Sequence, residues 1–240
     1  RDQKWCGIST RRTNDESARS IKHVIMASKS LKARASELSN TQYQLDYLSN
    51  GIFQDGTLPI FKDKLKEHQL DEIRPKDLSI LQINIGYMCN QVCAHCHVDA
   101  GPDRKEMMDR TTLEACLDVM RNHKIETVDL TGGAPEMHPE FRWFVAQIRK
   151  TTSVEEIIVR SNLTIIMANK KYHDLPDFFK QHQVHVISSL PFYKRNKTDR
   201  QRGSGVFDQS IATLKKLNSV GYGQAESPLE LDLVYNPSGA

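Results

Sequence analysis

The sequence predicts an α/β fold, a partial (β/α) barrel with an N-terminal extension. Two observations lead to this class. From residue 78 onward, strand-like segments alternate with helix-like segments, and repeated β–α units form parallel sheets through right-handed crossovers. In addition, the chain places its most unusual segments directly after strands, where the loops of such folds converge on one site.

Short runs rich in Val, Ile and Leu define the expected strands. They are Ile80–Ile85, Ile125–Leu130, Glu156–Arg160, Val184–Ser189 and Leu229–Tyr235. A cysteine-rich loop follows the first strand, and polar or glycine-containing segments follow the next three: Thr131–Glu136, Arg160–Asn162 and Ser188–Pro191. We therefore expect these four segments to build one site.

Start and stop signals define the helices between the strands. A capping box of Thr111 and Glu114 predicts a helix whose apolar positions are Leu113, Cys116, Leu117 and Met120. Pro139 is expected at the first turn of a helix with the apolar face Phe141, Phe144, Val145 and Ile148. A further helix with Phe207, Ile211 and Leu214 is expected to end near Gly221.

Residues 1–77 form the predicted extension, and residues 78–240 form the predicted core. The first forty residues carry nine Lys or Arg and four Asp or Glu, a polar composition typical of a disordered or loosely helical segment. Between residues 56 and 74, a short amphipathic helix is expected to end before Pro75, with the apolar residues Leu58, Phe61, Leu65 and Leu70. The chain stops inside what looks like a continuing domain, so we expect a fragment.

Composition narrows the function classes. A net charge of +3 in 240 residues is too small to indicate a nucleic-acid partner or an anionic membrane surface. The sequence contains no apolar run long enough to span a bilayer. Five cysteines, three of them clustered, favour a metal site in a reducing compartment over a disulfide framework. We expect a cytoplasmic protein, with organelle targeting by the Ser- and Arg-containing N-terminus as the alternative.

The cysteine loop is the strongest functional signal. Cys89, Cys93 and Cys96 have the spacing C-x3-C-x2-C, and three thiolates on one loop leave one iron of a cubane iron–sulfur cluster open. The alternative is a zinc site completed by His95 or His97. Structural zinc usually joins two separated ligand pairs, and a histidine adjacent to Cys96 is poorly placed to complete a tetrahedron. The spacing therefore favours the cluster. Cys116, on an apolar helix face, is expected in the core, and Cys6 has no evident partner.

This loop resembles that of the radical SAM enzymes, whose open iron binds S-adenosyl-L-methionine. The resemblance implies a [4Fe-4S] cluster on the three cysteines and S-adenosyl-L-methionine as the second cofactor. It also implies cofactor contacts from residues of the four strand-end segments: His95 against the adenine, Gly132, Gly133 and Glu136 near the methionine, and Asn162 and Ser189 at its polar groups. In place of the family's usual glutamate after the glycines stands Ala134, and His95 replaces the commoner aromatic residue. Asn162 and Ser189 are alternatively local caps of the following turns.

A more specific resemblance covers about the last two thirds of the chain. The segments 84–102, 131–136, 201–207 and 233–240 are similar to those of the arsenosugar biosynthesis radical SAM proteins. This resemblance implies cleavage of S-adenosyl-L-methionine to a 5′-deoxyadenosyl radical and transfer of the adenosyl group to a dimethylated trivalent arsenical. A ferredoxin or flavodoxin-type protein is the expected electron donor. The rival hypotheses are a radical SAM enzyme acting on a peptide or other small molecule, and a zinc-binding module without enzymatic activity.

Two further segments permit more than one interpretation. His97 and Asp99 either orient a ligand of the cluster site or form a turn. The basic stretch from Lys194 to Arg202 lacks regular aromatic interleaving, so a solvated loop is expected in place of a nucleic-acid patch. Gly203 and Gly205 suggest a flap over the site.

Overall fold

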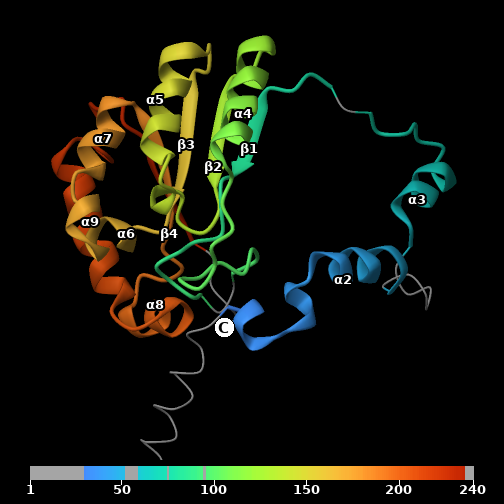
Figure 1. Ribbon diagram of the computed structural model, residues 1–240, viewed down its shortest axis with the longest axis horizontal. Coiled ribbons are helices and arrows are strands. Elements are labelled where there is room, and N and C mark those ends of the chain that lie inside the picture. Colours follow the sequence, from blue (N-terminus) through green and yellow to red (C-terminus); the bar gives the residue numbers. More distant parts are fainter. Residues whose placement is uncertain (1–29, 52–58, 75, 94–95, 236–240) are drawn as a thin grey trace, which may run out of the picture.

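A single parallel sheet forms the centre of the protein. The computed structural model describes residues 30–51, 59–74, 76–93 and 96–235 (Figure 1). The strands lie in the order β1-β2-β3-β4-β5, and every neighbouring pair is parallel. Their bounds are Ile80–Asn84, Thr127–Thr131, Glu156–Ser161, Val184–Ser189 and Leu231–Val234. The sheet does not close on itself, which confirms the predicted partial (β/α) barrel.

The two faces of the sheet differ in character. On β3, Ile157 and Val159 are fully buried, whereas Arg160 is exposed on the opposite face. The buried face packs against the helices that connect the strands, through Leu113, Leu117, Phe144, Ile148, Phe179 and Leu217. The other face carries polar side chains such as Asp129 and His185 between apolar ones. This pattern leaves one face of the sheet available for a site.

The connecting helices are α4 (Arg110–Asn122), α5 (Phe141–Thr151), α6 (Thr164–Ala168), α7 (Leu175–Gln181), α8 (Arg195–Arg202) and α9 (Val206–Ser219). Short turns of other helix types are η4 (Pro135–Met137) and η5 (Lys170–Tyr172). The predicted apolar faces of α4 and α5 are buried in the core. Gly221, with φ +117°, follows the end of α9, as its sequence position predicted. None of the helices in the described ranges is long and apolar enough to cross a membrane.

Two predicted helix starts were wrong. Helix α4 is capped by Asp109, whose carboxylate accepts a hydrogen bond from the Thr112 backbone N–H at 2.7 Å. Thr111 lies inside the helix, and Glu114 pairs with Arg110, so the expected capping box does not form. Asp109 takes the cap because its backbone is extended (φ −80°, ψ 169°) just before the helix, which directs its carboxylate at the free N–H groups of the first turn. Helix α5 begins at Phe141, and Pro139 lies in the preceding turn.

The N-terminal part contains the short elements η1 (Lys32–Arg34), η2 (Glu37–Ser39), α2 (Thr41–Asp46), η3 (Tyr47–Gly51) and α3 (Phe61–Glu67). Helices α2 and α3 lie on an arm beside the sheet (Figure 1). The predicted amphipathic helix is α3, but it buries none of its residues, and Phe61 is exposed. Leu58, Pro75 and residues 1–29 fall outside the described ranges. The division of the chain at residue 78 stays a prediction.

Candidate functional site

A cavity of about 280 Å³ opens at the carboxyl ends of the strands. Its lining combines residues from all four segments that the sequence analysis singled out: Cys89, Cys93, Cys96, Gly132, Gly133, Asn162 and Ser189. His97, Arg160 and Arg202 also line it. His95, the expected adenine contact, lies outside the described residues. The parallel topology is the reason for this convergence, since the carboxyl ends of β1 to β4 share one edge.

The three cysteines line this cavity together. Cys89 is buried, and its Sγ accepts hydrogen bonds from the Gln91 backbone N–H and from Asn162 Nδ2, both at 3.4 Å. The Sγ of Cys96 accepts one from the Ala100 backbone N–H at 3.3 Å. N–H donors directed at sulfur stabilise thiolate charge and tune an iron–sulfur cluster. The donor set therefore fits the predicted cluster.

The same sulfurs do not fit a single zinc ion well. Tetrahedral zinc with zinc–sulfur bonds of about 2.3 Å holds its ligand atoms roughly 3.8 Å apart. Among the residues that the structure describes, the three ligand atoms found within 4.8 Å of one another belong to Glu156, His185 and Glu230, not to cysteines. The three cysteine sulfurs do not form such a close group in the described structure.

Burial sets the protonation of the thiols. It raises the pKa of Cys89 to about 11 and also raises the pKa of Cys93, where the nearby Arg202 guanidinium opposes the shift. Without metal, these two groups are therefore protonated at neutral pH. Metal binding must displace their protons, which makes loading of the site depend on pH.

The glycine loop after β2 packs directly on the cysteine loop. A Cβ at Gly132 would lie 2.3 Å from the carbonyl oxygen of Gly86, and one at Gly133 would lie 2.3 Å from that of Met88. The Gly133 N–H donates to the Gly86 oxygen at 2.9 Å, and Gly132 has φ +139°. Glycine is thus required here by the backbone of the neighbouring loop, in addition to the predicted approach of a ligand.

Asn162 connects the end of β3 to the cysteine loop. Its Nδ2 donates to Cys89 Sγ and, at 2.7 Å, to Asn90 Oδ1. Its Oδ1 accepts from the Ile165 backbone N–H at 3.0 Å, which is the local capping considered as an alternative. Ser189 lies at the end of β4 on the cavity wall, and its carbonyl oxygen accepts a hydrogen bond from Arg202 Nη1. For both residues, cofactor contact stays a prediction.

Glu136 lies in η4, behind the glycine loop. It is 5% exposed, is absent from the cavity lining, and neither carboxyl oxygen has a hydrogen-bond partner of good geometry among the described residues. Burial raises its pKa to about 7, and the neighbouring Ser161 hydroxyl only partly offsets this shift. Contact between Glu136 and the cofactor stays a prediction. Burial favours the protonated, neutral form of this carboxyl group.

Comparison with known proteins identifies the family. The family model described as the radical SAM superfamily matches residues 83–227. The chain belongs to the radical SAM superfamily. Members of this superfamily use a [4Fe-4S] cluster and S-adenosyl-L-methionine, which are the two cofactors that the sequence predicted.

Individual relatives are distant. GTP 3′,8-cyclase of Heliobacterium modesticaldum and the probable GTP 3′,8-cyclase of Sulfolobus acidocaldarius are 26% and 22% identical over 90 and 93 residues. These matches cover 36% and 39% of this chain, and 28% and 29% of the relatives. The chain therefore matches less than a third of the length of these radical SAM relatives.

Solved structures share the fold. SuiB of Streptococcus suis bound to S-adenosylmethionine has a TM-score of 0.53 and 14% identity, over 74% of this chain and 44% of that one. The protein anSMEcpe with bound AdoMet has a TM-score of 0.52 and 15% identity, over 66% of this chain and 43% of that one. At these identities the likeness shows the radical SAM fold alone.

Two arginines at this radical SAM site were missed by the sequence analysis. The basic stretch is helix α8 and not a solvated loop, and its last residue, Arg202, is 7% exposed at the cavity. Asp199 accepts hydrogen bonds from the backbone N–H groups of Gly205 and Phe207 at 3.0 and 2.9 Å, which brace the turn after α8, and the flap over the site stays a prediction. The sequence did contain a signal for Arg202, because this residue lies in the segment 201–207, which carries part of the family resemblance.

The second arginine is Arg160 on β3. Its Nη2 lies 2.8 Å from Asp129 Oδ2, and its Nε lies within 3.0 Å of both carboxylate oxygens. Asp129 is buried and also accepts from Gln82 Nε2 at 2.7 Å. These residues lie in neighbouring register on β1, β2 and β3. The Arg160–Asp129 pair has no net charge. The guanidinium of Arg160 is therefore a hydrogen-bond donor held in place at the cavity.

His97 lines the cavity, whereas Asp99 is absent from its lining. The Asp99 carboxylate accepts hydrogen bonds from the backbone N–H groups of Leu31 and Lys32 and from Arg104 Nη1, at 3.0 Å for Lys32 and 2.9 Å for Arg104. Asp99 therefore anchors η1 against the loop that follows the cysteines. Of the two residues, His97 alone lines the cavity.

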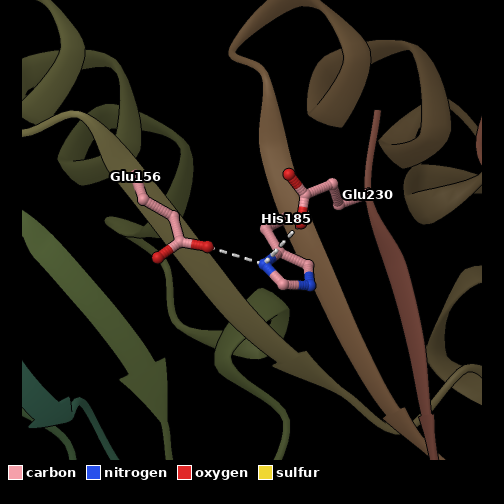
Figure 2. Close-up of side chains that lie close together, drawn as sticks. All are labelled: Glu156, His185 and Glu230. Carbon is pink, nitrogen blue, oxygen red and sulfur yellow. Dashed lines mark hydrogen bonds and ion pairs between the residues drawn. The ribbon is translucent and has the colours of Figure 1, made fainter. Parts of the chain in front are cut away.

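A second polar cluster lies on the same strands, toward their amino ends. His185 Nδ1 is 2.7 Å from Glu156 Oε1 and 3.8 Å from Glu230 Oε2, and Figure 2 shows these three side chains pointing toward one another. Its Nε2 is 3.0 Å from Asp232 Oδ2. Two of these carboxylates hydrogen-bond the ring and raise the pKa of His185 against the effect of burial. With a carboxylate at each ring nitrogen, the histidine is best satisfied as an imidazolium that links β3, β4 and β5.

Proposed function

We propose that this chain is the cluster- and cofactor-binding core of an enzyme that adenosylates a dimethylated trivalent arsenical. The observation that carries this proposal is the extended cysteine loop, residues 84–102, with its resemblance to the arsenosugar biosynthesis proteins. Support comes from the spatial arrangement: cavity-lining residues come from each of the segments 84–102, 131–136, 201–207 and 233–235.

In this proposal, Cys89, Cys93 and Cys96 hold a [4Fe-4S] cluster, and the open iron binds S-adenosyl-L-methionine. When bound, these cofactors supply the one-electron cleavage that releases the adenosyl group for transfer. His95, Gly132, Gly133, Glu136, Asn162 and Ser189 are the proposed cofactor contacts. The electron donor is proposed to be a ferredoxin or flavodoxin-type protein.

The protein's own part is to orient and to exclude water. The cavity lining includes the apolar residues Val98, Ala100, Ile187 and Val234. Apolar walls suit methyl groups on a substrate and keep solvent from a reactive intermediate. Arg160, neutralised by Asp129, offers a hydrogen-bond donor to an oxygen or hydroxyl on the substrate without attracting a strongly anionic one.

The rival activity is radical SAM chemistry on another small molecule or on a peptide. The observation that favours it is the identity of the relatives, two of which are named as GTP 3′,8-cyclases, while SuiB is also known bound to its precursor peptide SuiA. Membership of the radical SAM superfamily argues against the zinc-binding module.

Anaerobic reconstitution of the full-length protein tests the proposal. The protein is loaded with iron and sulfide, then given dithionite, S-adenosyl-L-methionine and dimethylarsenite, and the nucleosides are analysed by mass spectrometry. An arsenic-bearing deoxyadenosine supports the proposal. Free 5′-deoxyadenosine alone, with GTP and peptide substrates then tried in parallel, would transfer support to the rival activity. Zinc in place of iron and no cleavage would refute both.

A further inference from the structure

Two arginines near the cluster loop are almost fully buried, but only one has an anionic partner. Arg104 and Arg202 are each 7% exposed. Arg104 pairs with Asp99 at 2.9 Å and with Glu106 at 3.1 Å. Within the described ranges, Arg202 forms no ion pair with a carboxylate. Both side chains are buried and positively charged, but only the charge of Arg104 is neutralised by carboxylates.

The hydrogen bonds of Arg202 with good geometry are to neutral acceptors, and its guanidinium also lies beside the Cys93 sulfur. Nη1 donates to the carbonyl oxygen of Ser189, and Nη2 donates to Gln91 Oε1 at 3.1 Å. Its Nε is buried and has no hydrogen-bond partner in the described structure. Removing one partner of a buried ion pair strongly destabilises proteins, because it leaves a charge without compensation. A guanidinium in this position calls for an anion.

The surroundings indicate where that anion binds. Arg202 lines the same cavity as the three cysteines. Gln91 Oε1, which accepts from Arg202, also lies 3.4 Å from Cys93 Sγ, so the guanidinium and the sulfur meet at one oxygen atom. Three thiolates make a cluster site anionic, and thiolate character is what metal binding requires of these residues.

We propose that Arg202 is the charge partner of the iron–sulfur cluster and raises its reduction potential. Reduction brings one electron from a low-potential donor into the cluster and adds one negative charge without making or breaking a bond. A fixed positive charge stabilises the reduced state more than the oxidised state, and net charge and burial are established determinants of cluster potentials. The inference rests on the cluster site of the proposed function and is independent of the substrate.

The test is a redox titration of the reconstituted protein, followed by electron paramagnetic resonance. Arg202→Gln is compared with the native protein, with the charge-conserving Arg202→Lys and with Arg200→Gln. Arg200 is exposed on the same helix, so its replacement removes an equal charge from the solvent side. At the native midpoint potential, we expect the reduced-to-oxidised ratio of Arg202→Gln to fall about tenfold, a shift of about 59 mV to lower potential for one electron. Arg202→Lys recovers most of this loss, and Arg200→Gln leaves the ratio unchanged.

A second variant covers the case in which Arg202→Gln does not retain a cluster. Gln91→Glu keeps the arginine and its packing, but it places a carboxylate where Oε1 now accepts from Nη2. Neutralising the guanidinium in this way lowers the potential in the same direction. A native potential in Gln91→Glu or in Arg202→Gln overturns the inference. If the native protein itself shows no cluster signal, the proposed function fails first, and the inference fails with it.

Discussion

Asn162 donates a hydrogen bond to the sulfur of Cys89, 73 positions earlier in the sequence and 3.4 Å away. The same amide nitrogen holds Asn90, and the amide oxygen caps the turn into α6. One side chain therefore uses its donors on the cysteine loop and its acceptor on the end of β3. The cluster loop of β1 is held in place by a strand that is not its neighbour in the sheet.

Replacing Asn162 by Ala should loosen the cysteine loop. The change removes the acceptor of the Ile165 N–H and the donor to Asn90 Oδ1, and an unsatisfied buried group costs about 1–3 kcal/mol. We expect lower stability in urea and less iron retained per chain after reconstitution. Asn169→Ala is the control, because Asn169 caps η5 in a similar way but does not contact the cysteine loop. Equal iron retention in the two variants would contradict the role of Asn162.

Gly133→Ala should disrupt the contact between the two loops. Its Cβ would lie 2.3 Å from the Met88 carbonyl oxygen, and a backbone atom cannot move aside as a flexible side chain can. We expect loss of iron binding, measured by absorbance and metal analysis. Gly205→Ala is the comparison, since its nearest neighbour would be 4.0 Å away and only the positive φ is strained, at about 1 kcal/mol. Normal iron content in Gly133→Ala would show that the loops separate without consequence.

Cys93→Ala should abolish cleavage of S-adenosyl-L-methionine, because two thiolates do not replace the three-ligand set. Production of 5′-deoxyadenosine, followed by chromatography, measures this. Cys116→Ala is the matched control: Cys116 lies on α4 and packs at the edge of the core, so its loss should leave iron binding intact. Unchanged 5′-deoxyadenosine production in Cys93→Ala would refute the cluster assignment.

The buried Glu136 predicts a pH dependence of stability. The folded-state pKa, about 7, lies above the ordinary value near 4.3, so the folded state binds the proton more tightly. The resulting destabilisation is absent below about pH 4, grows as pH rises, and is complete above about pH 7. Glu136→Gln should therefore raise the free energy of unfolding more at pH 8 than at pH 5. Urea titrations at pH 5 and pH 8 measure the free energy of unfolding. An equal effect at the two pH values would mean that a charged partner near Glu136 offsets the effect of burial on its pKa.

His185 contributes stabilisation where Glu136 contributes destabilisation, but stability again falls as pH rises, because both pKa values are raised in the folded state. The folded-state pKa of His185 is raised above the ordinary value of about 6.5, so its stabilisation is fully present below that value. The stabilisation is lost as pH rises through the folded-state pKa. We expect His185→Gln to destabilise the protein at pH 6 and to have less effect at pH 9, with a modest amplitude because Glu230 and Asp232 are exposed. Nuclear magnetic resonance titration of the ring measures the pKa directly, and an ordinary value would disprove the pairing.

Patterns local in sequence predicted much of the structure. The five strands lie where the runs of Val, Ile and Leu placed them, with ends shifted by one or two residues, as at Ile125 and Thr127. The apolar spacing in α5 correctly predicted its buried face, because residues that recur with the helical period lie on one side of the helix. Helix starts were less reliable, since Asp109 and Thr111 are both good caps and only the folded backbone decides which one reaches the free N–H groups.

The sequence by itself determined the fold class and the loop that carries the cysteines, because these depend on periodicity and on spacing within one segment, and its resemblance to the radical SAM enzymes indicated the cofactors. Only the tertiary structure decided the environment of that loop. It placed Glu136 behind the glycine loop, brought Arg202 to the cavity, and directed Asn162 at Cys89. Burial and charge pairing depend on which distant segments meet, and one-dimensional spacing does not contain that information.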